Sequence, residues 1–228
     1  MVPLLRAGDP FPPLDSARRR PNGLLAAGRD LSVPTLVEAY SRGIFPWFGE
    51  GDPILWWSPD PRMVLFPEEL HVSTSLARRM KKDDYEVSLD RAFGAVIRGC
   101  AEPRADHEGT WITARMIAAY ERLHRAGLAH SVETWMDGEL AGGLYGVALG
   151  RAFFGESMFT RRSDASKIAL VRLVRQLAAW GFEVIDCQMK TAHLSAFGAR
   201  EIPRRQFAAL LGELVRQPGV EAPWRFAL

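Results

Sequence analysis

The sequence predicts an α+β protein in which helices pack against a mixed β-sheet. Runs rich in β-forming residues alternate with apolar stripes of helical period, most clearly in the second half of the chain. Asp137-Gly138 is a strong hairpin signal between two such runs. From residue 130 onward the expected order is strand–strand–strand–helix–strand–helix, which favours a mixed sheet covered by helices.

The N-terminal quarter differs in character from the rest. Residues 1–31 are rich in Pro, Gly and Arg and are expected to be irregular. Ser32 is expected to cap a helix that ends near Gly43. Frequent prolines then exclude a long helix, so the tryptophans that follow belong on loops or short strands. We expect a small N-terminal domain, 1–62, followed by a larger one, 63–228.

Regular elements are expected throughout the larger domain. In its first half they are a strand at 63–66, a basic helix after Ser73, a strand at 85–89, a helix capped by Asp90 and a helix ending at Arg125. In its second half they are strands at 130–136, 139–149 and 151–159, a helix from Ala165 capped by Asp164, a strand at 182–188, a short helix at 190–197 and a last helix after Pro203.

Bulk properties restrict the function only loosely. The chain has 228 residues, a net charge of +2 and a hydrophobic fraction of 47%, as in soluble globular proteins. Cys100 and Cys187 are the only cysteines, which predicts neither a disulfide framework nor a zinc site. The apolar stretch at the start of the chain is too short and too interrupted by prolines for a signal peptide. The sequence also contains no long uncharged apolar run, so we expect no transmembrane helix. We therefore expect a cytoplasmic protein with no membrane partner.

The stretch from Gly142 to Lys167 is the best candidate for a site. Strict alternation in a strand places Phe154, Glu156 and Met158 on one face. A carboxylate between apolar neighbours is costly to bury without a polar partner. Glu156 is therefore either a site residue or a solvated residue at a strand end. Closely spaced glycines here favour a crowded site over a plain sheet.

Asp186 and Gln188 alternate with Cys187, so their side chains are expected to share one face at the carboxyl end of a strand. Such strand ends often carry binding sites. The alternative is a cap where the chain enters a loop. Cys187 is a weak candidate nucleophile, because no histidine is spaced to activate it.

Aromatic and basic side chains leave two interpretations open. Trp47, Trp56 and Trp57 form either a small aromatic core or a stacking platform for a base. The basic residues are either solvated or contact phosphates. The candidate phosphate contacts are Arg18, Arg19, Arg20, Arg78, Arg79, Lys81, Lys82, Arg161 and Arg162.

Several aromatic-rich strings in fixed order resemble the leucyl/phenylalanyl-tRNA–protein transferase family of bacteria. The strings are PNGLLA at 21–26, GIFPWF at 43–48, WWSPDPR at 56–62, GTWIT at 109–113, GGLYGVALG at 142–150, FFGESMF at 153–159, DCQ at 186–188 and EIPRR at 201–205. The resemblance implies an acyl-CoA N-acyltransferase-like (GNAT-like) fold for the larger domain, after a small N-terminal domain.

The resemblance also implies roles for individual residues. Asp186 and Gln188 match the family's proposed catalytic pair. Residues that match aminoacyl-adenosine contacts are Trp47, Trp111, Phe153 and Glu156. Residues that match the apolar side-chain pocket are Leu144, Met158, Leu173 and Ile185. Leu144 replaces a methionine common at its position, and Leu173 replaces a bulkier aromatic residue.

The implied reaction transfers Leu, Phe or Met from aminoacyl-tRNA to the α-amine of an N-terminal Arg or Lys of an acceptor protein, which marks that protein for degradation. No metal or organic cofactor is needed, because the tRNA ester is already activated. Asp186 would anchor the cationic acceptor terminus and Gln188 would orient the amine, since an ordinary aspartate is a weak base for an ammonium. Direct base action by Asp186 is the alternative.

Two other functions remain open. One is an acetyl-CoA-dependent acetyltransferase, although the loop at 160–166 contains no glycine to wrap a pyrophosphate. The other is a non-catalytic RNA-binding module that uses the tryptophans and basic clusters. Such a module has no need for Glu156, Asp186 and Gln188 beside an apolar pocket.

Overall fold

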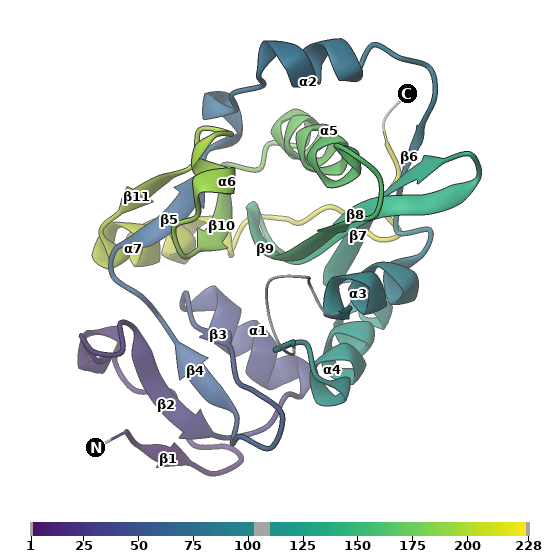
Figure 1. Cartoon of the computed structure of the whole chain (residues 1–228). Coiled ribbons are helices and arrows are strands. Elements are labelled where there is room, and N and C mark those ends of the chain that lie inside the picture. Colours follow the sequence, from purple (N-terminus) through teal and green to yellow (C-terminus); the bar gives the residue numbers. More distant parts are fainter. Residues whose placement is uncertain (1, 103–109, 227–228) are drawn as a thin grey trace.

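The computed structural model describes residues 2–102 and 110–226, and the described part contains a small and a large β-sheet (Figure 1). The small sheet has four strands in the order β1-β2-β4-β3. These strands are β1 (Leu4–Leu5), β2 (Leu24–Gly28), β3 (Phe45–Pro46) and β4 (Leu55–Trp57). Before β2 and after it come the short helix η1 (Leu14–Ser16) and the helix α1 (Val33–Ser41).

The large sheet has seven strands in the order β11-β5-β10-β9-β8-β7-β6. Only β9 and β10 pair in parallel, so the sheet is mixed as expected. The strands are β5 (Arg62–Leu65), β6 (Glu86–Leu89), β7 (Ala129–Met136), β8 (Glu139–Leu149), β9 (Ala152–Thr160), β10 (Val184–Gln188) and β11 (Arg200–Ile202).

Helices cover both faces of the large sheet. Helix α5 packs on one face, while α3 and α4 lie on the face turned toward α1 and the small sheet (Figure 1). The helices of this part are η2 (Pro67–Glu69), α2 (Thr74–Arg79), α3 (Phe93–Ala101), α4 (Ala114–Arg125), α5 (Ala165–Ala179), α6 (Ala192–Ser195) and α7 (Arg204–Leu214). The predicted α+β class is confirmed.

Several local predictions are confirmed by the geometry of turns and caps. The Ser32 hydroxyl accepts a hydrogen bond from the Thr35 N–H at the start of α1. Asp137 and Gly138 both have positive φ, 54° and 77°, as a tight two-residue hairpin turn requires. Helix α7 begins directly after Pro203.

Other local predictions are wrong. Residues 1–31 are not wholly irregular, because they contain β1 and β2, and β11 was not expected at all. Asp90 does not cap α3, whose flanking residue is Ala92. The Asp90 carboxylate instead accepts hydrogen bonds from the His130 ring and from the Trp224 N–H, so it fastens the C-terminal segment to the sheet. Asp164 stands before α5 but binds Lys167 rather than a backbone N–H.

Two β-bulges interrupt the centre of the large sheet. Between β8 and β9, Tyr145 pairs with Ser157 and Gly146 pairs with Gly155, so Glu156 is an extra residue on β9. Between β10 and β5, the register shifts between Asp186 and Gln188. A bulge changes which face the following side chains occupy. The strict alternation predicted around Glu156 and across Cys187 is therefore wrong.

The apolar interior runs through both sheets. One cluster of buried residues joins the small sheet, α1, α3, α4 and the near face of the large sheet. A second cluster lies beneath α5 on the other face. The domain boundary at residue 62 stays a prediction. Within residues 2–102 and 110–226, no helix is long and apolar enough to cross a membrane.

Candidate functional site

A cavity of about 980 Å³ opens between β9, β10, α5 and the segment that follows β3. The ten residues that the sequence assigned to catalysis, to aminoacyl-adenosine and to the side-chain pocket all line it. They are Trp47, Trp111, Leu144, Phe153, Glu156, Met158, Leu173, Ile185, Asp186 and Gln188. The structure thus brings together residues that are far apart in the chain, although it does not by itself assign their roles.

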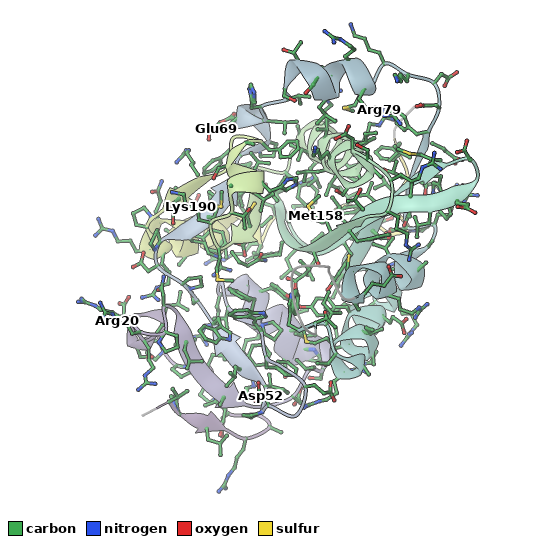
Figure 2. The ribbon with its side chains drawn as sticks, viewed as in Figure 1. Arg20, Asp52, Glu69, Arg79, Met158 and Lys190 are labelled. Atoms are coloured by element: carbon green, nitrogen blue, oxygen red, sulfur yellow. The ribbon has the colours of Figure 1, made fainter. Side chains whose placement is uncertain are left out.

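One part of the cavity is apolar. Met158 lies near the middle of the molecule, where β9 borders the cavity (Figure 2). The Phe153 ring lies against the Gly146 backbone, where a Cβ atom would be only 2.5 Å from a ring carbon. Trp224 packs on this ring as well, with 6.0 Å between centroids. Phe153 therefore packs against both the Gly146 backbone and Trp224, and any side chain at position 146 would displace its ring.

At the polar end, Glu156 belongs to a closed ring of hydrogen-bonding groups. The Tyr40 hydroxyl donates to Glu156 Oε1 at 2.7 Å, and the Tyr120 hydroxyl donates to Oε2 at 2.9 Å. The two hydroxyl oxygens also lie within hydrogen-bonding distance of each other. Tyr40 comes from α1, Tyr120 from α4 and Glu156 from the bulge of β9, so three elements build the ring.

Burial determines the protonation of this ring. Removal from water raises the pKa of Glu156 to about 7, although both tyrosine hydrogen bonds oppose the rise. The nearby Asp186 carboxylate adds to the rise and the Arg62 guanidinium opposes it. Burial also raises the pKa of Tyr40 and of Tyr120 well above the usual range, so both phenols keep their protons. Glu156 is the group of the ring that titrates near neutral pH.

Asp186 is buried in different surroundings. The Arg62 Nε and an Arg62 terminal nitrogen bind its two oxygens at 2.7 and 2.6 Å. Arg62 and Asp186 are 0% and 1% exposed at their side chains. Arg62 also donates to the Gly43 carbonyl and lies over the rings of Phe45 and Phe207. The pair is a bidentate, fully buried ion pair, in which neither Asp186 oxygen is left without a donor.

Gln188 is hydrogen-bonded through its backbone to Asp186 of this ion pair. Its backbone N–H donates to Asp186 Oδ1 at 3.0 Å, and its φ of 56° is unusual for a residue other than glycine. Its side-chain Nε2 is buried without a hydrogen-bond partner among the described residues, as is the Tyr145 hydroxyl. Both groups belong to residues that line the cavity. Unpartnered buried donors of this kind point to a ligand or to water as the missing partner.

The tryptophans divide between the two interpretations that the sequence left open. Trp56 is fully buried and donates to the Gly28 carbonyl, so it belongs to the core. Trp47 is 37% exposed, lines the cavity and packs edge-to-face on Trp57. Trp111 also lines the cavity. Among the described residues, Trp47 and Trp111 are therefore the tryptophans that line the cavity.

The candidate phosphate contacts are also of two kinds. Arg79, Arg161 and Arg162 form ion pairs with acidic side chains, of which Arg79 binds Asp84 and Arg161 binds Glu102. Arg78, Lys81 and Lys82 are exposed on and after α2. In the view of Figure 2, Arg20 and Arg79 lie on different sides of the molecule, away from Met158.

Cys187 also lines the cavity, but burial raises the pKa of its thiol far above the usual range. Its Sγ lies 3.7 Å from the Ile185 carbonyl oxygen. A thiol that resists ionisation is a poor nucleophile. Elsewhere in the described part of the chain, no three His, Cys, Asp or Glu side chains are placed to hold a metal ion.

Sequence reasoning missed Arg62, Tyr40 and Tyr120. Tyr40 lies within the helix that the sequence predicts between Ser32 and Gly43, but no role was predicted for it. The available signal was chemical, because a buried tyrosine hydroxyl normally finds a polar partner. Which partner it finds depends on contacts across the fold, since Tyr40 and Glu156 are 116 positions apart.

The α+β fold encloses a cavity that has an apolar part next to polar side chains. Comparison with known proteins specifies the family. The family model described as leucyl/phenylalanyl-tRNA protein transferase matches residues 64–212, and the model for its N-terminal domain matches residues 29–60. The chain belongs to this family of aminoacyltransferases.

Individual relatives align with this chain over nearly their full length. The leucyl/phenylalanyl-tRNA–protein transferase of Nitrosospira multiformis is 65% identical over 99% of this chain and 97% of the relative. That of Nitrosomonas europaea is 62% identical over 99% of this chain and 96% of the relative. Among solved structures, a GCN5-related N-acetyltransferase from Kribbella flavida is 12% identical over 70% of this chain and 56% of that chain, with a TM-score of 0.38.

Proposed function

We propose that this protein transfers leucine, phenylalanine or methionine from aminoacyl-tRNA to the α-amine of an N-terminal Arg or Lys of an acceptor protein, and that the added residue marks the acceptor for degradation. The observation that carries the proposal is the cavity, which has an apolar part and a polar end in a chain of this family. The tRNA ester is already activated, so the reaction needs no cofactor.

The roles proposed for the cavity residues follow its two parts. The donor's side chain would occupy the apolar part, and the residues proposed to surround it are Leu144, Met158, Leu173 and Ile185. The terminal adenosine would lie near Trp47 and Trp111, with Phe153 and Glu156 at the aminoacyl end. An apolar pocket discriminates weakly between side chains of similar size, which fits the acceptance of several donors.

Asp186 and Gln188 would act as a unit. The Arg62–Asp186 ion pair fixes the backbone of Gln188 in its unusual conformation, so Asp186 would be a positioning residue. The free Gln188 amide would hydrogen-bond the reacting ester or amine. The sequence suggested instead that Asp186 anchors the acceptor's cation, but Arg62 already provides a cation to both of its oxygens.

A transfer assay tests the proposal. Purified protein is incubated with tRNA charged with labelled leucine, phenylalanine or methionine and with peptides that begin with Arg, Lys or Ala. We expect labelled peptide only with the Arg and Lys peptides. Acetyl-CoA in place of charged tRNA should give no product, and transfer from acetyl-CoA alone would contradict the proposal.

The tRNA body should bind through its phosphates. Each lost phosphate contact lowers the slope of log affinity against log salt by about one. Lys81→Ala and Lys82→Ala should lower that slope, because both side chains are exposed. Arg162→Ala should change it less, because Arg162 is paired with Asp137. An affinity that does not depend on salt would contradict phosphate recognition.

A further inference from the structure

The aminoacyl transfer proposed above requires a proton transfer. The attacking amine must lose a proton when it becomes an amide nitrogen, and the departing ribose oxygen must gain one. A group that performs both steps must lie in the cavity, must be able to accept a proton near neutral pH and must return it. Among the carboxyl groups that line the cavity, the half-buried Glu156 and the buried Asp186 are the candidates.

Asp186 is poorly placed for this task. Arg62 binds both of its oxygens, and Gln188 donates a further hydrogen bond to Oδ1. Protonation of Asp186 would break a bidentate pair and leave the Arg62 guanidinium, which is 0% exposed, without its counter-charge. An uncompensated charge at such a site is strongly unfavourable.

Glu156 has the opposite arrangement. The ring formed by Glu156, Tyr40 and Tyr120 contains three oxygen–oxygen contacts. The two phenols supply two protons, so an ionised Glu156 leaves one contact of the three without a proton. A protonated Glu156 supplies a third proton, so that each of the three oxygen–oxygen contacts can then be a hydrogen bond. The ring therefore has a place for the proton that the reaction releases, and both phenols donate to the carboxylate once that proton has left.

We propose that Glu156 is the catalytic proton acceptor of the transfer reaction, and that Tyr40 and Tyr120 are positioning residues which build its proton-binding ring. This inference rests on the proposed aminoacyl transfer. The neutral amine forms the C–N bond with the ester carbonyl carbon and gives one proton to Glu156. The ester C–O bond breaks, and the ribose oxygen takes that proton, which restores the carboxylate.

The surroundings of Glu156 fit a group that titrates in the working range. The ionisable groups facing it are Tyr40 on α1, Tyr120 on α4, Tyr145 on β8, Asp186 on β10 and Arg62 on β5. Burial raises the pKa of Glu156 to about 7, where a general base is most effective. Arg62 and Asp186 are paired with each other, so their opposite effects on this pKa partly cancel.

The test compares single-turnover transfer rates across pH at saturating donor and acceptor. We expect Glu156→Gln to lose about 10²–10⁴-fold in rate, the usual contribution of general base catalysis, together with the acidic limb of the profile. Tyr40→Phe and Tyr120→Phe each remove a donor that stabilises the carboxylate. The acidic limb should therefore move to higher pH by about half to one unit, as expected for one lost hydrogen bond to the ionised form.

Tyr85→Phe is the matched control, because its hydroxyl donates to the Met80 carbonyl outside the cavity. Its rate and pH profile should equal those of the wild type. If Glu156→Gln keeps the wild-type rate and profile, or if the tyrosine variants move the limb to lower pH or leave it in place, the inference is overturned. Near-ultraviolet circular dichroism shows whether each variant is folded.

Infrared difference spectroscopy provides a readout that needs no tRNA. A carboxylic acid band should titrate with a midpoint near pH 7 and disappear in Glu156→Gln. Absence of this band in the wild type would overturn the ring as a proton acceptor. If the band titrates but the wild type transfers nothing from any charged tRNA, the proposed function fails, and the catalytic role of Glu156 fails with it.

Discussion

Glu156 on β9 and Asp186 on β10 line the same cavity, and each stands at a β-bulge, but their hydrogen-bond partners differ. Asp186 is bound by a guanidinium that lies in the core. Glu156 is bound by two neutral hydroxyls. A buried cation keeps a carboxyl group charged, whereas hydroxyls alone do not compensate for lost hydration. The charge of its partner therefore helps to determine what each of these two carboxyl groups can do.

The largest expected effect comes from removing the cation. Arg62→Met leaves Asp186 as an unpaired buried charge, which should lower the free energy of unfolding by about 3–5 kcal/mol. Urea denaturation measures this. Arg91→Met is the control, because Arg91 pairs with Glu86 at the surface and should cost far less. Adding Asp186→Asn to Arg62→Met should recover part of the loss, and a double variant as unstable as the single would contradict the explanation.

The second effect concerns how stability depends on pH. The pKa of Glu156 is about 7 in the folded protein, above its ordinary value of 4.5. The folded state therefore holds this proton more tightly than the unfolded state. The resulting stability, at most about 3 kcal/mol, is complete below pH 4.5 and is lost as the pH rises through 7.

Unfolding free energies of the wild type and of Glu156→Gln at a series of pH values measure this contribution. The difference between the two curves should change between pH 4.5 and about 7, in the sense that the wild type loses stability relative to the variant. Glu50→Gln, at an exposed position, should run parallel to the wild type. Parallel curves for Glu156→Gln would show that Glu156 is not perturbed.

The third effect concerns the space in the cavity at Gly155. Gly155 lines the cavity, and a Cβ atom there would meet only the Asp186 carbonyl oxygen, at an ordinary 3.6 Å. Gly155→Ala should therefore fold normally but place a methyl group in the cavity that is proposed to hold the reactants. We expect transfer to fall by about 10²-fold, as small misplacements of reactants do.

Gly212→Ala on α7 is the control, because nothing lies within 4 Å of its Cβ position and the site is elsewhere. It should be stabilised by up to about 1 kcal/mol and transfer at the wild-type rate. Full activity of Gly155→Ala would mean that the reaction does not use the space beside Gly155.

The smallest expected effect is on which amino acid the apolar part of the cavity prefers, while the transfer reaction itself is retained. Met158→Ala enlarges the pocket without touching the tyrosine ring, so it should shift preference from leucine toward phenylalanine by about tenfold. Competition between the two charged tRNAs measures the ratio. A folded variant that transfers neither residue would show that Met158 is more than a pocket wall.

Local chemistry was predictable from the sequence wherever neighbouring residues decide it. The α+β class, the Asp137-Gly138 hairpin and the Ser32 cap follow from short-range rules, and the structure has them. The ten site residues were identified through motifs, and all of them line one cavity. The failures at β1 and β2 have a physical cause. These strands are short, and the pairing of β1 with β2 and of β2 with β4 cannot be predicted from a local sequence pattern.

The sequence by itself determined which side chains are available: two acidic groups, an amide, apolar walls and tryptophans. Only the tertiary structure determined which partners each of these side chains contacts. Each bulge adds one residue to a strand, and a single extra residue reverses the alternation on which face predictions depend. Arg62 and Asp186 are 124 positions apart, and Tyr40 and Glu156 are 116 apart. Contacts over such separations form only when the whole chain is packed, so the difference between the two carboxyl groups is a property of the fold.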